Sequence, residues 1–290
     1  MSHQPQGDLE RLYEPIWAGG LVAMRWLFAL AALVGHGRRV TGIGDVYGAP
    51  DMVFTTGWYQ LAEYFYLDTT MAYVMWAVGI VGIGMIAWGG KAFRPGMILW
   101  FIGSWALIGQ EALNVKAYDR LLTWIAIGFF FSAAGERDLT RKYRSPLLRY
   151  YLMIVFSAIY GSTGLLKLIY EPAWWTGEVM SLHLVEQFHG GNMLASWLSG
   201  FQVLTSIMGW WTIIFEVAFP FLIWFRKTNP WVLVLGFGFH IGLLALMQVG
   251  PFGFVSACAY PVLLCPEVAR DWHARFVAWR SGTPAVPRAG

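Results

Sequence analysis

The feature that most constrains this chain is the recurrence of long apolar runs between residues 16 and 266, each ended by charged residues, Pro or Gly. About 20 consecutive apolar residues are needed to cross the roughly 30 Å hydrocarbon core of a bilayer. Charged residues make up only 13% of the chain, whereas a soluble globular domain usually carries about 25%. The chain lacks the surface charge of a soluble protein. We therefore predict an all-α, polytopic transmembrane helical bundle.

Eight spans are predicted from the apolar runs. They are placed at 16–35, 70–90, 96–113, 119–134, 147–168, 206–225, 231–249 and 252–266. The stretch 47–67 is too polar to cross the membrane, so we expect a loop with an interfacial helix there. The connection 171–205 is predicted to hold a short helix at 178–188 and a surface-lying or re-entrant segment near 193–204.

Three regions follow from these spans: a cytoplasmic segment at 1–15, a transmembrane domain at 16–266, and a cytoplasmic tail at 267–290. The tail has an amphipathic pattern that could lie on the membrane surface. The residues that form this pattern are Arg270, Trp272, Arg275, Trp279 and Arg280.

Lys and Arg are distributed unequally between the two sides of the membrane. With eight spans, and with Arg120 and Arg149 at span ends counted with the adjacent loops, the side that holds both termini carries 14 of the 20 basic residues and the opposite side carries 4. The other two, Arg25 and Lys167, lie within spans. Cytoplasmic loops of membrane proteins are enriched in Lys and Arg. We therefore predict that both termini are cytoplasmic, and that the first span directs insertion without a cleaved signal peptide.

Three ionisable residues are predicted at similar depth near the bilayer centre: Arg25, Glu216 and His240. A charge there costs about 2.5–3.5 kcal/mol on insertion scales, so it needs a partner or water. One interpretation is a shared interior site, which in a small-molecule transporter could act as a proton relay. The other is a structural Arg25–Glu216 ion pair, with His240 bonded to a backbone carbonyl.

Lys167 is predicted near the outer end of the fifth span. It could extend its ammonium to the interface, or it could be a partly buried base. Other polar residues on the same predicted side could line an outer pocket with it. They are Gln110, Glu111, Asn114, Lys116, Glu171, Glu178, His183, Glu186 and His189.

Several classes of site are disfavoured by residue spacing. His183, Glu186 and His189 do not form the i, i+4 histidine pair of a zinc helix, so no metal site is predicted, and haem is equally disfavoured. Cys258 and Cys265, placed in one helix, would lie about 10 Å apart along its axis, too far for a disulfide. The scattered basic residues do not indicate nucleic acid binding.

Four stretches, in order along residues 18–265, resemble the HTTM family, the membrane domain shared with vitamin K-dependent gamma-carboxylase and related bacterial proteins. They are AGGLVAMRWLFALAALVG, YGSTGLLKLIYEPAWWTGEVM, FEVAFPFLIWF and GFGFHIGLLALMQVGPFGFVSACAY. The second matches the family's Tyr…Gly-x-x-Lys-Leu…Trp…Gly segment. The resemblance implies a short bacterial-type member in the inner membrane.

In the carboxylase, a lysine in the Gly-x-x-Lys-Leu context deprotonates vitamin K hydroquinone. The resemblance therefore implies that Lys167 and His240 are catalytic and that a quinone or hydroquinone reaches a membrane pocket. Residues expected to bind substrate are Arg25, Asn114, Lys116, Trp174, Trp175 and Glu216.

Two departures disfavour full glutamyl carboxylase activity. Lys116 stands near the place of the carboxylase's catalytic histidine, and the large extracytoplasmic domain is expected to be absent. The leading hypothesis is a quinol-linked or lipid-linked membrane enzyme. The alternatives are a non-catalytic maturation or assembly factor for an exported peptide, and a small-molecule transporter. Expected partners are membrane lipids, a quinone, and an exported peptide or protein.

Overall fold

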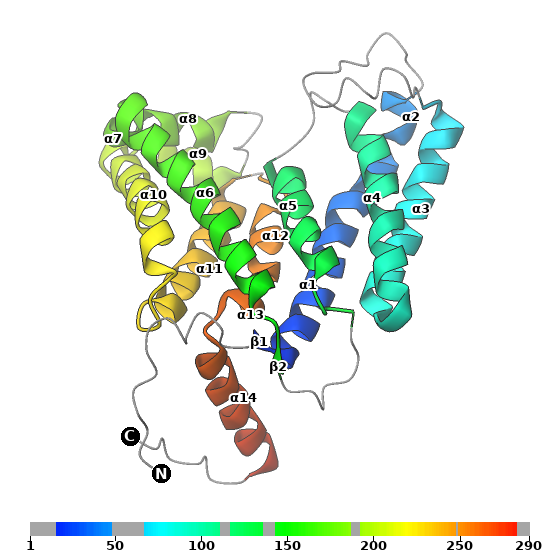
Figure 1. Ribbon diagram of the computed structural model, residues 1–290. Coiled ribbons are helices and arrows are strands. Elements are labelled where there is room, and N and C mark those ends of the chain that lie inside the picture. The colour runs from blue at the N-terminus through cyan, green and yellow to red at the C-terminus, as the bar shows by residue number, and fades with distance from the viewer. Residues whose placement is uncertain are drawn as a thin grey trace, which may run out of the picture. The chain divides into compact units, whose positions relative to one another are not determined.

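The computed structural model describes residues 16–47, 67–110, 117–135, 143–186, 192–247 and 249–282, which are almost entirely helical (Figure 1). The helices are α1 (Ala18–Gly37), η2 (Arg38–Gly42), α2 (Ile43–Val46), α3 (Thr69–Trp88), η5 (Gly90–Ala92), α4 (Phe93–Gln110), α5 (Ala117–Phe131), α6 (Leu147–Tyr170), α7 (Ala173–Thr176), α8 (Glu178–Val185), α9 (Met193–Ser199), α10 (Gln202–Leu222), α11 (Asn229–Leu246), α12 (Phe252–Cys258), α13 (Tyr260–Leu263) and α14 (Pro266–Ser281). One antiparallel pair of two-residue strands joins β1 (Ile16–Trp17) to β2 (Tyr143–Arg144).

The prediction of an all-α polytopic membrane bundle is confirmed. Within the described residues, six helical segments are long and apolar enough to cross a membrane, and a bent helix pair at 252–281 would make a seventh. The six are Ala18–Val46, Thr69–Trp88, Gly90–Gly109, Leu147–Tyr170, Gln202–Leu222 and Asn229–Leu246. Many large apolar side chains on these helices are exposed, as expected for surfaces that face lipid.

Two of the eight predicted spans differ from the structure. The span predicted at 119–134 is α5, whose 15 residues reach only about 22 Å at 1.5 Å per residue. The span predicted at 252–266 is broken into α12 and α13. Pro261 explains the break, because proline lacks an N–H and its ring clashes with the carbonyl four residues earlier.

The break also corrects the placement of the two cysteines. Cys258 is the last residue of α12 and Cys265 precedes α14, so they do not share one helix. Both thiols are buried, and neither is in a disulfide. The connection predicted at 171–205 holds short helices: α8 corresponds to the helix predicted at 178–188, and α9 and the start of α10 cover 193–204. The interfacial helix expected in 47–67 lies outside the described residues.

The chain divides into two compact units. The amino-terminal unit comprises the described residues of 22–139 and 250–259; the carboxy-terminal unit comprises those of 1–21, 140–249 and 260–290. In the amino-terminal unit, α3 and α4 pack with almost no space between their backbones. A Cβ added at Gly96 would lie 2.8 Å from the Gly82 carbonyl oxygen and 2.7 Å from the Met85 Cβ. Small residues permit this approach, as they do in other membrane helix pairs.

In the carboxy-terminal unit, glycines likewise allow α6 and α10 to pack closely. A Cβ on Gly164 would lie 2.8 Å from the Glu216 Cβ, and one on Gly161 would lie 3.1 Å from Pro220. Helices α7 and α8 pack against α10, and α9 packs against α8; Figure 1 shows these short helices gathered at one end of α6 and α10. The glycines on α6 thus determine which residues of α10 face it.

Candidate functional site

An ion pair between α6 and α10 is the centre of the candidate site. Lys167, in the last turn of α6, places its Nζ 2.6 Å from Oε2 of Glu216 on α10. The two side chains are 15% and 9% exposed. The pair forms because Gly164, one turn before Lys167, allows the α10 backbone to come close at Glu216. Lys167 is therefore sheltered by protein and does not extend freely to the membrane surface.

Trp174 covers this ion pair. The Lys167 Nζ lies 4.9 Å from the centre of the Trp174 ring, within the range of a cation–π interaction. The Trp174 Nε1 donates a hydrogen bond of 2.6 Å to Oε2 of Glu171. The Trp174 carbonyl also lies against Gly209 of α10, where any Cβ would collide with it. Trp174 is thus fixed on three sides.

A second polar pair lies on the same face of α6. Tyr160 precedes Lys167 by seven residues, which is two helical turns, and its hydroxyl is 2.6 Å from Nε2 of His240 on α11. His240 is 2% exposed, so it does not face lipid. Its partner is a side-chain hydroxyl, where the structural interpretation of the sequence expected a backbone carbonyl. Tyr260 of α13 is also buried here, with its hydroxyl beside Gly236 and near that of Tyr160.

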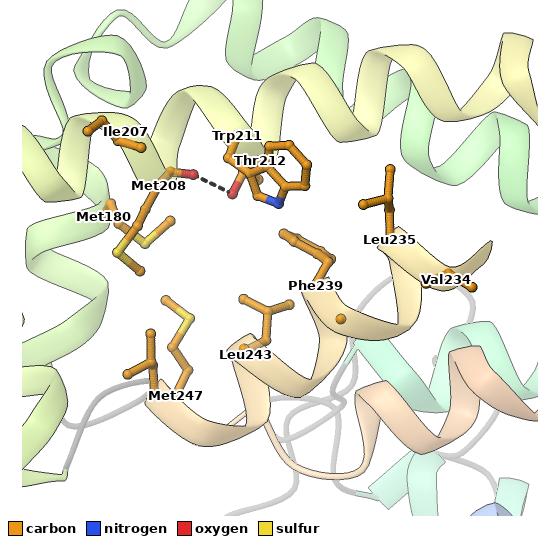
Figure 2. Close-up of a pocket in the computed structure, with 13 residues that line it drawn as sticks. Met180, Ile207, Met208, Trp211, Thr212, Val234, Leu235, Phe239, Leu243 and Met247 are labelled. Atoms are coloured by element: carbon orange, nitrogen blue, oxygen red, sulfur yellow. Dashed lines mark hydrogen bonds between the residues drawn. The ribbon is translucent and has the colours of Figure 1, made fainter. Parts of the chain in front are cut away.

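An apolar pocket of about 530 Å³ opens between α10, α11 and α8 (Figure 2). In the close-up, Met180, Met208 and Met247 gather at one end, while Phe239 and Leu243 extend from α11 toward α10. The lining residues are Met180, Ile207, Met208, Trp211, Thr212, Val234, Leu235, Gly238, Phe239, Gly242, Leu243, Leu246 and Met247. The size suits a small-molecule ligand, since such sites commonly measure about 300–1,000 Å³.

The pocket adjoins the ion pair through Thr212 but is separated from the Tyr160–His240 pair by Phe239. Thr212 lines the pocket, and Glu216 follows it on α10 after one helical turn. Phe239 also lines the pocket, and its neighbour His240 turns away from it toward Tyr160. The Phe239 ring stacks on Phe215 at 5.0 Å, which separates the pocket from the Tyr160–His240 pair.

Arg25 belongs to the other unit and is held there by helix ends. Its Nη1 donates a 3.0 Å hydrogen bond to the carbonyl of Ala134, just after α5. It also lies against Gly89, which follows α3 with a φ of +73°. These partners lie just after the ends of α5 and α3, whereas Glu216, which the structural interpretation of the sequence expected as the ion-pair partner of Arg25, pairs with Lys167. Its predicted role in substrate binding stays a prediction.

The remaining predicted site residues have mixed outcomes. Asn114 and Lys116 lie outside the described residues. Trp175, next to Trp174, is 39% exposed and packs on Trp210 with ring centres 6.0 Å apart, away from the ion pair.

Two of the three residues considered as metal ligands, His183 and Glu186, lie among the described residues. His183 lies in the last turn of α8 and Glu186 directly follows the helix, with Nδ1 of the histidine 2.5 Å from Oε1 of the glutamate. His189 lies outside the described residues. In the described part of the chain, no group of three His, Cys, Asp or Glu residues is placed to hold a metal ion.

A buried polar cluster in the amino-terminal unit was not found by sequence reasoning. His36 contacts the Trp76 carbonyl through Nε2 at 2.9 Å and the Ser104 hydroxyl through Nδ1 at 3.0 Å. Nearby in sequence, Arg39 pairs with Asp119 at 3.0 Å, both side chains being under 10% exposed. His36, Arg39 and Asp119 lie near helix ends, where charges are ordinary in a sequence, so no sequence signal marked them. By contrast, Tyr160 could have been found from its i, i+7 spacing to Lys167.

Comparison with known families identifies the chain. The model of the HTTM domain matches residues 13–272. The chain belongs to the HTTM family. This match extends over both units and every helix of the ion pair, the Tyr160–His240 pair and the pocket. No curated protein and no solved structure matches the chain. As an HTTM protein, it is a multi-pass membrane protein related to the carboxylase membrane domain.

Proposed function

We propose that this HTTM protein is a membrane enzyme that removes a proton from a quinol, or from another hydroxyl compound dissolved in the lipid phase, with Lys167 as the base. The observation that carries the proposal is the Lys167–Glu216 pair, sheltered from water and one helical turn from an apolar pocket. An apolar substrate would enter such a pocket from the bilayer and meet few polar groups, which would orient it.

The pair provides a chemical route for proton removal. Burying two charges in a low-dielectric site is costly. A neutral state of the pair, with the shared proton on Glu216, therefore competes with the charged state. The Lys167 amine then has a lone pair and can accept the proton of the substrate O–H. The product is an ammonium beside a quinolate, so the new positive charge stabilises the new negative charge.

Trp174 and His240 have supporting roles in this proposal. Trp174 keeps water from the Lys167 ammonium and offers its ring to the cation. The hydrogen bond between the Tyr160 hydroxyl and Nε2 of His240 fixes the orientation of the imidazole, so His240 would support the packing of α6 and α11 beside the ion pair from the far side of the Phe239–Phe215 stack. Glutamyl carboxylation is not part of the proposal.

The test is quinol-dependent oxygen uptake by the protein in liposomes, since a quinolate reacts with oxygen much faster than the quinol does. Lys167→Met removes the amine and keeps the length of the side chain, so we expect uptake to fall to the background rate. Lys227→Met, outside the candidate site after α10, is the matched control and should keep full activity. Wild-type uptake in a folded Lys167→Met variant would refute Lys167 as the base, and no uptake by the wild type would refute the quinol.

A further inference from the structure

A second apolar groove lies in the amino-terminal unit, between α4 and α5. Its volume is about 210 Å³. Sites for whole small molecules commonly measure roughly 300–1,000 Å³, so this groove suits one segment of a longer molecule. Four of its lining residues are at least 39% exposed: Ile98, Phe101, Ile127 and Phe131. The groove therefore opens on a surface that faces lipid.

The groove is close to a membrane boundary. Helix α4 begins at Phe93 and α5 ends at Phe131, and the Gly90 N–H donates a hydrogen bond of 2.5 Å to the Gly135 carbonyl. This bond keeps the start of α4 and the end of α5 at the same level. Every lining residue is within about 12 Å of that level at 1.5 Å per residue. The distribution of Lys and Arg predicts that this side is cytoplasmic.

Two exposed cations stand at this end of the groove. Arg94 precedes three lining residues of α4 by three, four and seven positions, so it lies on the same face of the helix. Those residues are Met97, Ile98 and Phe101. Lys91 is in η5, just before α4. Both cations are exposed, and neither pairs with a carboxylate among the described residues. An anion can therefore bind them without breaking an existing ion pair.

The wall of the groove also holds a hydrogen-bond donor without a partner. Trp100 lines the groove and is 3% exposed, and in the described part of the chain its Nε1 has no acceptor. A buried indole N–H usually has one. Trp100 is about 9 Å deeper along α4 than Arg94. In a phospholipid, the ester carbonyls are likewise deeper in the membrane than the phosphate.

We propose that this groove binds an anionic phospholipid, with the phosphate at Lys91 and Arg94 and one acyl chain between α4 and α5. Basic pockets between membrane helices on the cytoplasmic side bind anionic headgroups. The apolar wall accepts the chain, and the Trp100 N–H suits an ester carbonyl. The inference is independent of the proposed function, because all of these residues belong to the amino-terminal unit.

The experiment compares two photoreactive lipids that differ only in the headgroup. Phosphatidylglycerol or phosphatidylcholine, each with a diazirine in one acyl chain, is added to the protein in phosphatidylcholine nanodiscs, and labelled peptides are mapped by mass spectrometry. We expect the phosphatidylglycerol probe to label the groove peptides of α4 and α5 roughly tenfold more strongly, since each basic residue attracts the anionic headgroup. Unlabelled phosphatidylglycerol should displace it, and its chain-free headgroup, glycerophosphoglycerol, should not.

The double variant Lys91→Gln/Arg94→Gln is the decisive test of the headgroup site. It should label equally with both probes. Arg275→Gln/Arg280→Gln is the matched control, because it removes the same charge from exposed positions of α14, and it should keep the preference for phosphatidylglycerol.

Ala126→Leu tests the chain site, because Ala126 lines the groove and is buried. The larger side chain should reduce labelling by both probes. If this variant fails to fold, the exposed charge variants still decide the outcome.

Three results would overturn the inference. They are equal labelling of the groove by the two probes, a preference for phosphatidylglycerol that survives Lys91→Gln/Arg94→Gln, and displacement of the probe by glycerophosphoglycerol. The last result would indicate a site for a free anion, in which the acyl chain has no part.

Discussion

At the scale of single residues, the central feature is that two ionisable groups in the core of the carboxy-terminal unit are each bonded to a polar side chain of another helix. Lys167 meets Glu216, and His240 meets Tyr160. Hydrocarbon offers no hydrogen bonds, so an ionisable group is tolerated within a membrane span where protein shelters it. Glu216 and Tyr160 lie on different helices from the residues that they bind, so each contact also specifies which two helices are neighbours.

We expect the protein to be more stable with Lys167 and Glu216 paired than with either charge buried without its partner. Glu216→Leu should destabilise the protein by about 3 kcal/mol, since removal of one partner leaves a buried charge. The double variant with Lys167→Met should recover most of that loss, with a coupling energy of about 2 kcal/mol. Reversible unfolding in mixed detergent micelles would measure this cycle. Simple additivity of the two single losses would show that the residues are not energetically coupled.

The Tyr160–His240 hydrogen bond makes a separate prediction. Tyr160→Phe keeps the ring, which packs edge-on to Phe215 at 5.4 Å, and removes the hydroxyl. We expect a loss of about 1–3 kcal/mol, because a buried polar atom loses its partner. The same unfolding assay applies, with Tyr170→Phe as control, since Tyr170 is 73% exposed. Equal stability of the two variants would contradict a structural role for the bond.

At the scale of helices, glycines act in two opposite ways. Gly164 brings α6 and α10 together and so creates the ion pair, whereas Gly238 and Gly242 leave α11 with an open face. The apolar spans look alike in composition, and the difference lies only in what a Cβ would meet. Glycine therefore serves both for close packing of two helices and for an open pocket wall.

Alanine substitutions should separate the two kinds of glycine. Gly164→Ala places a Cβ 2.8 Å from Glu216 and 2.9 Å from the Val217 nitrogen, so α10 must move, and we expect a loss of about 1–3 kcal/mol. Gly84→Ala meets open space and should be neutral or gain up to about 1 kcal/mol from helix propensity. Thermal unfolding in detergent compares them. A neutral Gly164→Ala would mean that this contact does not hold α6 and α10 together.

At the scale of the whole molecule, the chain is a multi-pass HTTM membrane protein made of two compact units. Six helical segments in the described residues satisfy the length and hydropathy of a span, with α5 shorter and the 252–266 region broken. The Lys and Arg distribution used to orient the chain was counted for eight spans. The orientation of the chain across the membrane is a prediction that reporter fusions can test directly.

Both termini are predicted to be cytoplasmic. Green fluorescent protein fused after residue 290 should fluoresce, while alkaline phosphatase fused there should be inactive, because the former folds in the cytoplasm and the latter outside it. A phosphatase fusion in the 171–205 connection, which has no Lys or Arg, should be active. The reverse pattern would show that the orientation prediction is wrong.

The sequence by itself determined the membrane class, the position of most helices and the family resemblance, because hydropathy and ordered motifs are local properties of the chain. It also pointed to Lys167, Glu216 and His240, since ionisable residues are conspicuous in apolar runs. Only the tertiary structure decided that Lys167 pairs with Glu216, that Tyr160 hydrogen-bonds to His240, and that an apolar pocket opens beside α11. The physical reason is that such contacts depend on which helix faces approach each other. That choice is made by close backbone contacts at positions such as Gly164, which hydropathy cannot distinguish from Gly242.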